Sequence, residues 1–140
     1  MTAFLSAFEP GRSGLYRTPD ELTALQQAAR RVGIACFNVD LQNVTGKREF
    51  LAACAAGLGF PATFGHNWDA LADSLRDFSW QPARGYVLHF EQARRLAEAA
   101  PQAYAAATEI LGIAAQYWES RGSVFLALID EAPELPAFSA

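Results

Sequence analysis

Three short, mostly apolar runs separated by helical segments constrain this chain more than any other feature of its sequence. The runs cover residues 34–39, 86–90 and 124–129. Strands that are apolar on both faces are typical of a parallel sheet covered by helices. We therefore expect an α/β fold in which a small three-stranded parallel sheet is packed with helices.

Apolar residues recur at helical spacing between these runs. Thr18 and Glu21 read as a capping box around Pro19, which predicts a first helix over residues 19–32. Further helices are expected over residues 47–58, 68–78, 91–100 and 101–120. We divide the chain into an N-terminal extension, residues 1–32, and a domain, residues 33–140. The extension consists of a loose leader followed by the helix 19–32.

Composition limits the classes of function. The net charge of −4 weighs against direct binding of nucleic acid, which needs a basic surface, and suits a basic protein partner. No apolar run reaches the roughly 18 residues that span a bilayer, and the first residues lack a basic signal. We expect a cytoplasmic protein without a membrane segment. Cys36 and Cys54 read as buried free thiols, and no spacing predicts a metal or cofactor.

Residues 60–77, FPATFGHNWDALADSLRD, carry the main functional signal. Asn67 can cap the helix that follows it. Asp69, Asp73 and Asp77 are spaced by four and share one helix face, opposite a face made of Trp68, Leu71, Leu75 and Phe78. Like charges at this spacing destabilise a helix, so nothing local requires the acidic face. It is either a working surface or a solvated face with Arg76 paired to it.

The same run resembles the signature of the barstar family, small intracellular inhibitors of secreted bacterial ribonucleases. The matching positions are Phe60, Pro61, Phe64, Gly65, Asn67, Trp68, Asp69, Ala70, Leu71 and Asp73. The similarity extends over roughly residues 33–130. It implies the three-stranded parallel sheet and no enzymatic activity. It also implies that an acidic loop and helix block the active site of a basic ribonuclease or nuclease toxin.

The resemblance also implies which residues bind the partner. Asp73 takes the dominant anchor position and Asp69 is its companion, because carboxylates can replace RNA phosphate oxygens in bonds to arginine. The expected partner-binding set is Thr63, Phe64, Gly65, His66, Asn67, Trp68, Asp69, Ala72, Asp73, Arg76 and Asp77. No catalytic residue, metal ligand or cofactor is expected, and the free protein is expected to be a monomer.

Some positions depart from the family pattern, namely Ala72, Arg76, Tyr117 and Arg121. They leave open an interaction module of the same fold that binds a partner other than a nuclease. A second alternative is an enzyme in which Asp69, Asp73 and Asp77 hold a divalent cation such as Mg²⁺ through oxygen ligands. His66 has no Ser or Cys nucleophile motif beside it, so a role as a general base is not favoured.

Overall fold

The computed structural model describes residues 5–139, so residues 1–4 of the predicted leader and Ala140 of the tail lie outside it. Two 3₁₀ turns, Leu5–Phe8 and Pro10–Arg12, open the described chain. The strands are β1 (Gly14–Arg17), β2 (Ile34–Asp40), β3 (Gly85–Glu91) and β4 (Val124–Ile129). The helices are α1 (Leu22–Arg31), α2 (Lys47–Leu58), α3 (Trp68–Leu75), α4 (Arg94–Ala99) and α5 (Pro101–Ser120).

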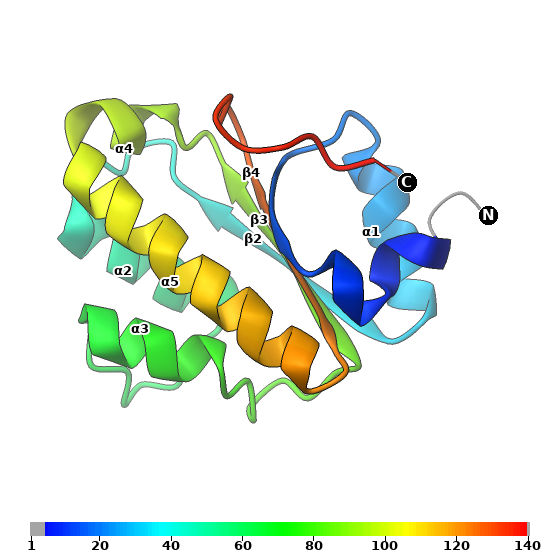
Figure 1. Ribbon diagram of the computed structural model, residues 1–140. Helices are drawn as coiled ribbons and strands as arrows, with labels where there is room; N and C mark the ends of the chain where they lie inside the picture. Colours follow the sequence, from blue (N-terminus) through cyan, green and yellow to red (C-terminus); the bar gives the residue numbers. More distant parts are fainter. Residues whose placement is uncertain (1–4, 140) are drawn as a thin grey trace.

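The strands form one parallel sheet in the order β1-β4-β3-β2 (Figure 1). The prediction of an α/β fold with a parallel sheet packed with helices is confirmed. The predicted number of strands is wrong, since residues 5–139 hold four and not three. The additional strand, β1, pairs with β4 from Gly14 opposite Leu126 to Arg17 opposite Ile129. It is short and contains no buried residue, so it lacks the apolar run that revealed the other three.

Helices cover both faces of this sheet. Residues that alternate along β3 point in opposite directions: Tyr86, Leu88 and Phe90 pack under α2, α3 and α5, whereas Val87 packs under α1. The chain moves from β2 to β3 to β4 in one direction across the sheet, but from β1 to β2 in the other. Because parallel connections are right-handed, α1 lies on the opposite face from the later helices, as Figure 1 shows.

The first helix does not begin where the capping box predicted. The backbone N–H of Thr18 donates to the Ile129 carbonyl oxygen at 3.3 Å, so Thr18 continues the pairing of β1 with β4. Helix α1 starts at Leu22, and Glu21 at its N-cap makes no side-chain capping bond. The predicted capping box and the predicted start at residue 19 are therefore wrong. Thr18, which the sequence pattern assigned to the helix cap, pairs with β4 instead.

The N-terminal segment and the C-terminal tail complete the α1 side of the molecule. Ala7, Leu25 and Ala29 are fully buried there with Phe138 from the tail. Tyr16 and Phe138 pack edge to face with ring centroids 4.9 Å apart. The described part of the predicted leader thus contributes to a second core. The division of the chain at residue 33 into extension and domain stays a prediction.

The cysteine prediction is confirmed in part. Cys54 is a buried free thiol in α2, whereas Cys36, also free, is only half-buried on the α1 side of β2. Within residues 5–139, none of the helices combines the length and the apolar character needed to cross a membrane.

Leu25→Ala tests whether α1 is an integral part of the core. Leu25 has no exposed surface, so we expect the substitution to lower the free energy of unfolding by about 2–5 kcal/mol. Leu22→Ala removes the same atoms from a half-buried position of the same helix and should cost clearly less. Urea unfolding followed by tryptophan fluorescence would measure both. Equal and small losses for the two variants would mean that α1 is dispensable for the fold.

Candidate functional site

Residues 60–67 form an ordered loop that leads into α3. Phe64 is buried at its centre, with its ring centroid 4.6 Å from that of Phe60 and 4.8 Å from that of His66. The Phe64 N–H donates to the Pro61 carbonyl oxygen at 2.9 Å. Thr63, Gly65 and His66 are exposed around this anchor. One buried aromatic ring therefore fixes a loop whose neighbouring residues face outward.

Asn67 joins this loop to the helix. Its Oδ1 accepts from the Ala70 N–H at 2.8 Å, and its Nδ2 donates to the Gly65 carbonyl oxygen at 3.2 Å. A Cβ atom at residue 65 would lie 3.1 Å from that Nδ2, so glycine suits the close approach. His66 adopts a left-handed φ of 52°, and its Nδ1 lies 3.0 Å from the Phe64 carbonyl oxygen. The predicted cap by Asn67 is confirmed.

Helix α3 carries the acidic stripe, which we define as Asp69, Asp73 and Asp77. All three side chains are exposed, while Leu71 and Leu75 are buried on the other side of the helix. The helix ends at Leu75 rather than at the predicted residue 78, and Phe78 is buried with a φ of 52°. Asp77 thus lies beyond the last helical turn, where its Oδ2 accepts from the Ser79 hydroxyl at 3.0 Å.

Arg76 contacts the stripe directly. Its Nη2 lies 2.9 Å from Asp73 Oδ1, and its Nε donates to the Ala72 carbonyl oxygen at 3.1 Å. Arg76 is half-buried by this arrangement, whereas the Asp73 side chain remains 78% exposed. The pairing that the sequence left open is present. Asp73 therefore faces solvent with one oxygen engaged by a cation of its own helix.

Packing from α5 and α2 holds α3 in place. Trp118 Nε1 donates to the Leu75 carbonyl oxygen at 2.7 Å, at the end of α3 where carbonyls lack helical partners. At the other end, Trp68 is half-buried, its ring centroid 6.1 Å from that of Phe50 and 5.4 Å from Lys47 Nζ. In Figure 1, α3 lies beside α5 on the outer side of the helical layer. The acidic stripe therefore projects from a helix that is fixed at both ends.

An open pocket adjoins the start of α3. Its volume is about 500 Å³, and Trp68, Lys47 and residues 99–103 line it. The first residues of α2, α3 and α5, namely Lys47, Trp68 and Pro101, meet there. Positive potential from helix N-termini and from Lys47 thus lies next to the negative Asp69. The surface around α3 is hollowed and of mixed charge rather than uniformly acidic.

The acidic stripe does not have the arrangement of a metal site. Among residues 5–139, no group of three or more His, Cys, Asp or Glu side chains is placed to hold a metal ion. Asp69, Asp73 and Asp77 follow one another along α3 and its end rather than converging on one point. The geometry gives the magnesium-enzyme alternative no support.

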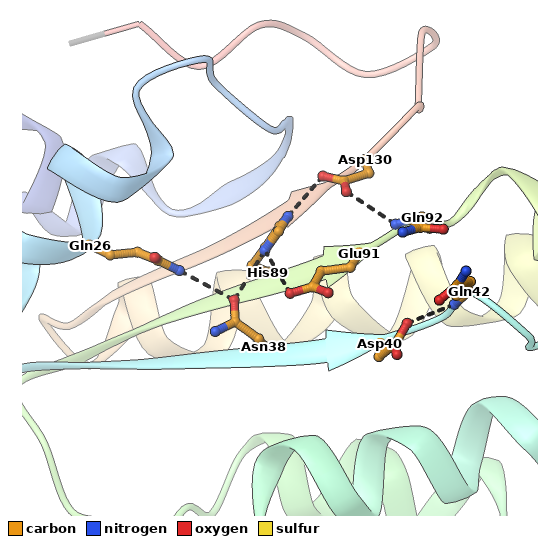
Figure 2. Close-up of polar contacts among 8 residues, drawn as sticks. All are labelled: Gln26, Asn38, Asp40, Gln42, His89, Glu91, Gln92 and Asp130. Atoms are coloured by element: carbon orange, nitrogen blue, oxygen red, sulfur yellow. Dashed lines mark hydrogen bonds and ion pairs between the residues drawn. The ribbon is translucent and has the colours of Figure 1, made fainter.

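A second polar cluster lies at the carboxyl end of the sheet, on its α1 face, and Figure 2 shows it between β2, β3 and β4. His89 is 7% exposed; its Nδ1 lies 3.0 Å from Asn38 Oδ1 and its Nε2 2.8 Å from Asp130 Oδ1. Glu91 Oε1 is 3.8 Å from the same Nδ1. Gln26 of α1 donates to Asn38 at 3.4 Å. The cluster links three strands to α1.

No pattern in the sequence predicts this cluster. A single histidine within an apolar run does not indicate which residues it contacts through hydrogen bonds. The register would have revealed them, since Asn38 lies opposite His89 and Asp130 directly follows the paired residue Ile129. Partial burial raises the pKa of Asp130, but hydrogen bonds, chiefly the one from His89, outweigh it and hold that pKa below its ordinary value.

Asp130→Asn tests the stabilising role of this cluster. We expect the free energy of unfolding at neutral pH to fall by about 1–3 kcal/mol, because a charged acceptor of the buried His89 is lost. The lowered pKa keeps folded Asp130 ionised at pH values where the unfolded carboxyl takes up a proton. Its stabilisation is therefore present above about pH 4 and lost as the pH falls further. Urea unfolding at a series of pH values should show a steeper acid loss in the wild type than in Asp130→Asn.

Asn67→Ala tests the cap that orders the loop. Loss of the side-chain acceptor for the Ala70 N–H should lower the free energy of unfolding by about 1 kcal/mol. Asn67→Asp keeps the acceptor and should retain most of that stability. Thermal unfolding followed by circular dichroism compares the two. If Asn67→Ala is as stable as Asn67→Asp, the cap does not order this helix.

Comparison with protein-family models gives one match. The family model described as "Barstar (barnase inhibitor)" matches residues 34–130, which is more than half of the chain. The match runs from β2 to Asp130 and includes the whole loop and α3, while β1 and α1 lie outside it. No curated protein sequence matches the chain. The family match covers the acidic helix and strands β2, β3 and β4, and on this basis the chain belongs to the barstar family.

Proposed function

We propose that this protein inhibits a basic ribonuclease by docking the 63–67 loop and the acidic stripe of α3 into the enzyme's active site. The observation that carries the proposal is the exposure of Asp69 and Asp73 on a capped helix, in a chain of the barnase-inhibitor family. A ribonuclease active site holds the phosphates of RNA by cationic side chains. Carboxylates on a fixed helix can take the same bonds from arginine and lysine.

The fixed geometry of the site suits tight binding of a partner. Asn67 and Trp118 hold the two ends of α3, so little conformational entropy is lost when the aspartates meet a partner. Trp68 and the adjoining pocket would add apolar contact beside the charged residues. We propose that the protein acts in the cytoplasm, as a monomer when free, and that it uses no cofactor. Its expected contacts are the full set of residues predicted from the sequence.

Two observations favour the alternative of a module that binds a partner other than a nuclease. The Arg76 guanidinium occupies one oxygen of Asp73, the residue expected to be the main anchor. At the end of α5, the Arg121 guanidinium lies 4.8 Å from the ring centroid of Tyr117, and both of these residues depart from the family pattern. The experiment below separates the two functions.

Inhibition of RNA cleavage by a panel of secreted bacterial ribonucleases, barnase among them, tests the proposed function. For an enzyme that the protein inhibits, Asp73→Asn should weaken inhibition at least about tenfold, because hydrogen bonds to a charged group are lost. Binding should also weaken as salt is raised, since the contacts are ionic. Asp20→Asn removes the same charge from an exposed residue before α1 and should change inhibition less than about twofold.

Two results would count against the proposal. The first is a protein that inhibits none of the panel at micromolar concentration. The second is an Asp73→Asn variant that inhibits as well as the Asp20→Asn control. The first result, with a folded protein by circular dichroism, would favour a partner other than a ribonuclease. The second would mean that inhibition does not depend on the Asp73 carboxylate, and it would contradict the proposed docking surface.

A further inference from the structure

Arg76 has a fixed position on the proposed docking surface. It is the first residue after α3, and two contacts hold its guanidinium: the ion pair with Asp73 Oδ1 at 2.9 Å and the hydrogen bond from Nε to the Ala72 carbonyl oxygen at 3.1 Å. The side chain is 40% exposed. The cation is thus presented together with Asp73 to whatever binds α3.

A cationic site of a partner that approaches Asp73 meets the Arg76 guanidinium already bound to it. If the ion pair stays intact, Asp73 offers only Oδ2 without competition, and a bidentate contact from an incoming arginine is blocked. If Arg76 moves away, the pair and the bond to Ala72 are lost, and a guanidinium must be accommodated near the cations of the partner. Both routes weaken binding to a site that is cationic on the Arg76 side.

We propose that Arg76 is a specificity-determining residue, an internal competitor for Asp73 that excludes ribonucleases whose cations approach the C-terminal end of α3. This inference rests on the proposed function, because it assigns a role within that docking surface. Arg76 would reject wrong partners by repulsion, which is one of the two general routes to binding specificity. It also gives a physical reason for a cation in the middle of an acidic stripe.

Barnase serves as the probe, since it is the enzyme in the description of the matched family. Arg76→Ala should bind barnase at least about tenfold more tightly than the wild type, measured by calorimetry at low salt. Release of an exposed ion pair accounts for up to about fivefold of this gain, and relief of like-charge repulsion for the rest. Arg31→Ala removes the same charge from an exposed residue at the end of α1, on the opposite face of the sheet, and should change binding less than about twofold.

A double-mutant cycle identifies the competition itself. In an Asp73→Asn background, the gain from Arg76→Ala should shrink at least about threefold, because the oxygen that Arg76 occupies is no longer an anion. In the free protein, ¹⁵N spectra of the arginine guanidinium groups should show restricted rotation at Arg76 that Asp73→Asn releases. This second measurement needs no partner.

The inference is overturned by any of three results. These are an Arg76→Ala variant that binds barnase no better than Arg31→Ala, a gain of equal size in the Asp73→Asn background, or guanidinium spectra that Asp73→Asn leaves unchanged. The proposed function is judged separately, by the loss of inhibition in Asp73→Asn against whichever ribonuclease the wild-type protein inhibits. Loss of inhibition in Asp73→Asn would therefore support the proposed function even if Arg76→Ala showed that Arg76 does not determine specificity.

Discussion

Burial of the parallel sheet on both faces is the constraint on which the rest of this structure depends. Every residue of β4 is buried, as are all residues of β3 except Glu91 at its end. Such strands need cover on two sides, because each face exposes a continuous apolar surface. The later helices provide the cover on one face, and α1 with the two chain ends provides it on the other (Figure 1). The position of α3 follows from this layering.

The acidic stripe can exist because other contacts stabilise α3. Asp69 and Asp73 repel each other at a spacing of four within α3, and Asp77 adds a third negative charge just beyond its end. The helix has only eight residues and is too short to be stable alone. The Asn67 cap, the buried Leu71 and Leu75, and the Trp118 bond compensate for this. Arg76 reduces the repulsion further by pairing with Asp73. Under the proposed function, the same ion pair that favours the folded helix competes with the partner for Asp73, so stability and binding conflict at this residue.

Local patterns in the sequence predicted most of the elements and all residues of the acidic stripe. Helices α2 and α5 and strand β4 have their predicted bounds because apolar spacing and proline or glycine residues define them locally. Strand β1 was missed because its residues are half-buried or exposed. Its partner strand, β4, lies more than a hundred residues further along the chain, beyond any local signal. The capping box at Thr18 failed for the same reason.

The geometry of the site was less predictable than its composition. The exposure of Asp69 and the cap by Asn67 follow from helical periodicity. Which rotamer Arg76 adopts, and so whether Asp73 is paired, depends on the end of α3 at Leu75, three residues earlier than the sequence indicated. The partners of His89 depend on strand register, which no local pattern encodes.

The pairing of the first strand with the last has a consequence for the order in which the molecule assembles. Gly14 pairs with Leu126, so β1 can enter the sheet only after β4 has left the ribosome. Until then, Val124, Leu126 and Leu128 lack part of the cover that the N-terminal segment and Phe138 supply. Contacts between residues so distant in sequence form slowly. The sheet therefore closes only after β4 has been made, and the nascent chain carries a partly uncovered apolar face until β1 and β4 pair.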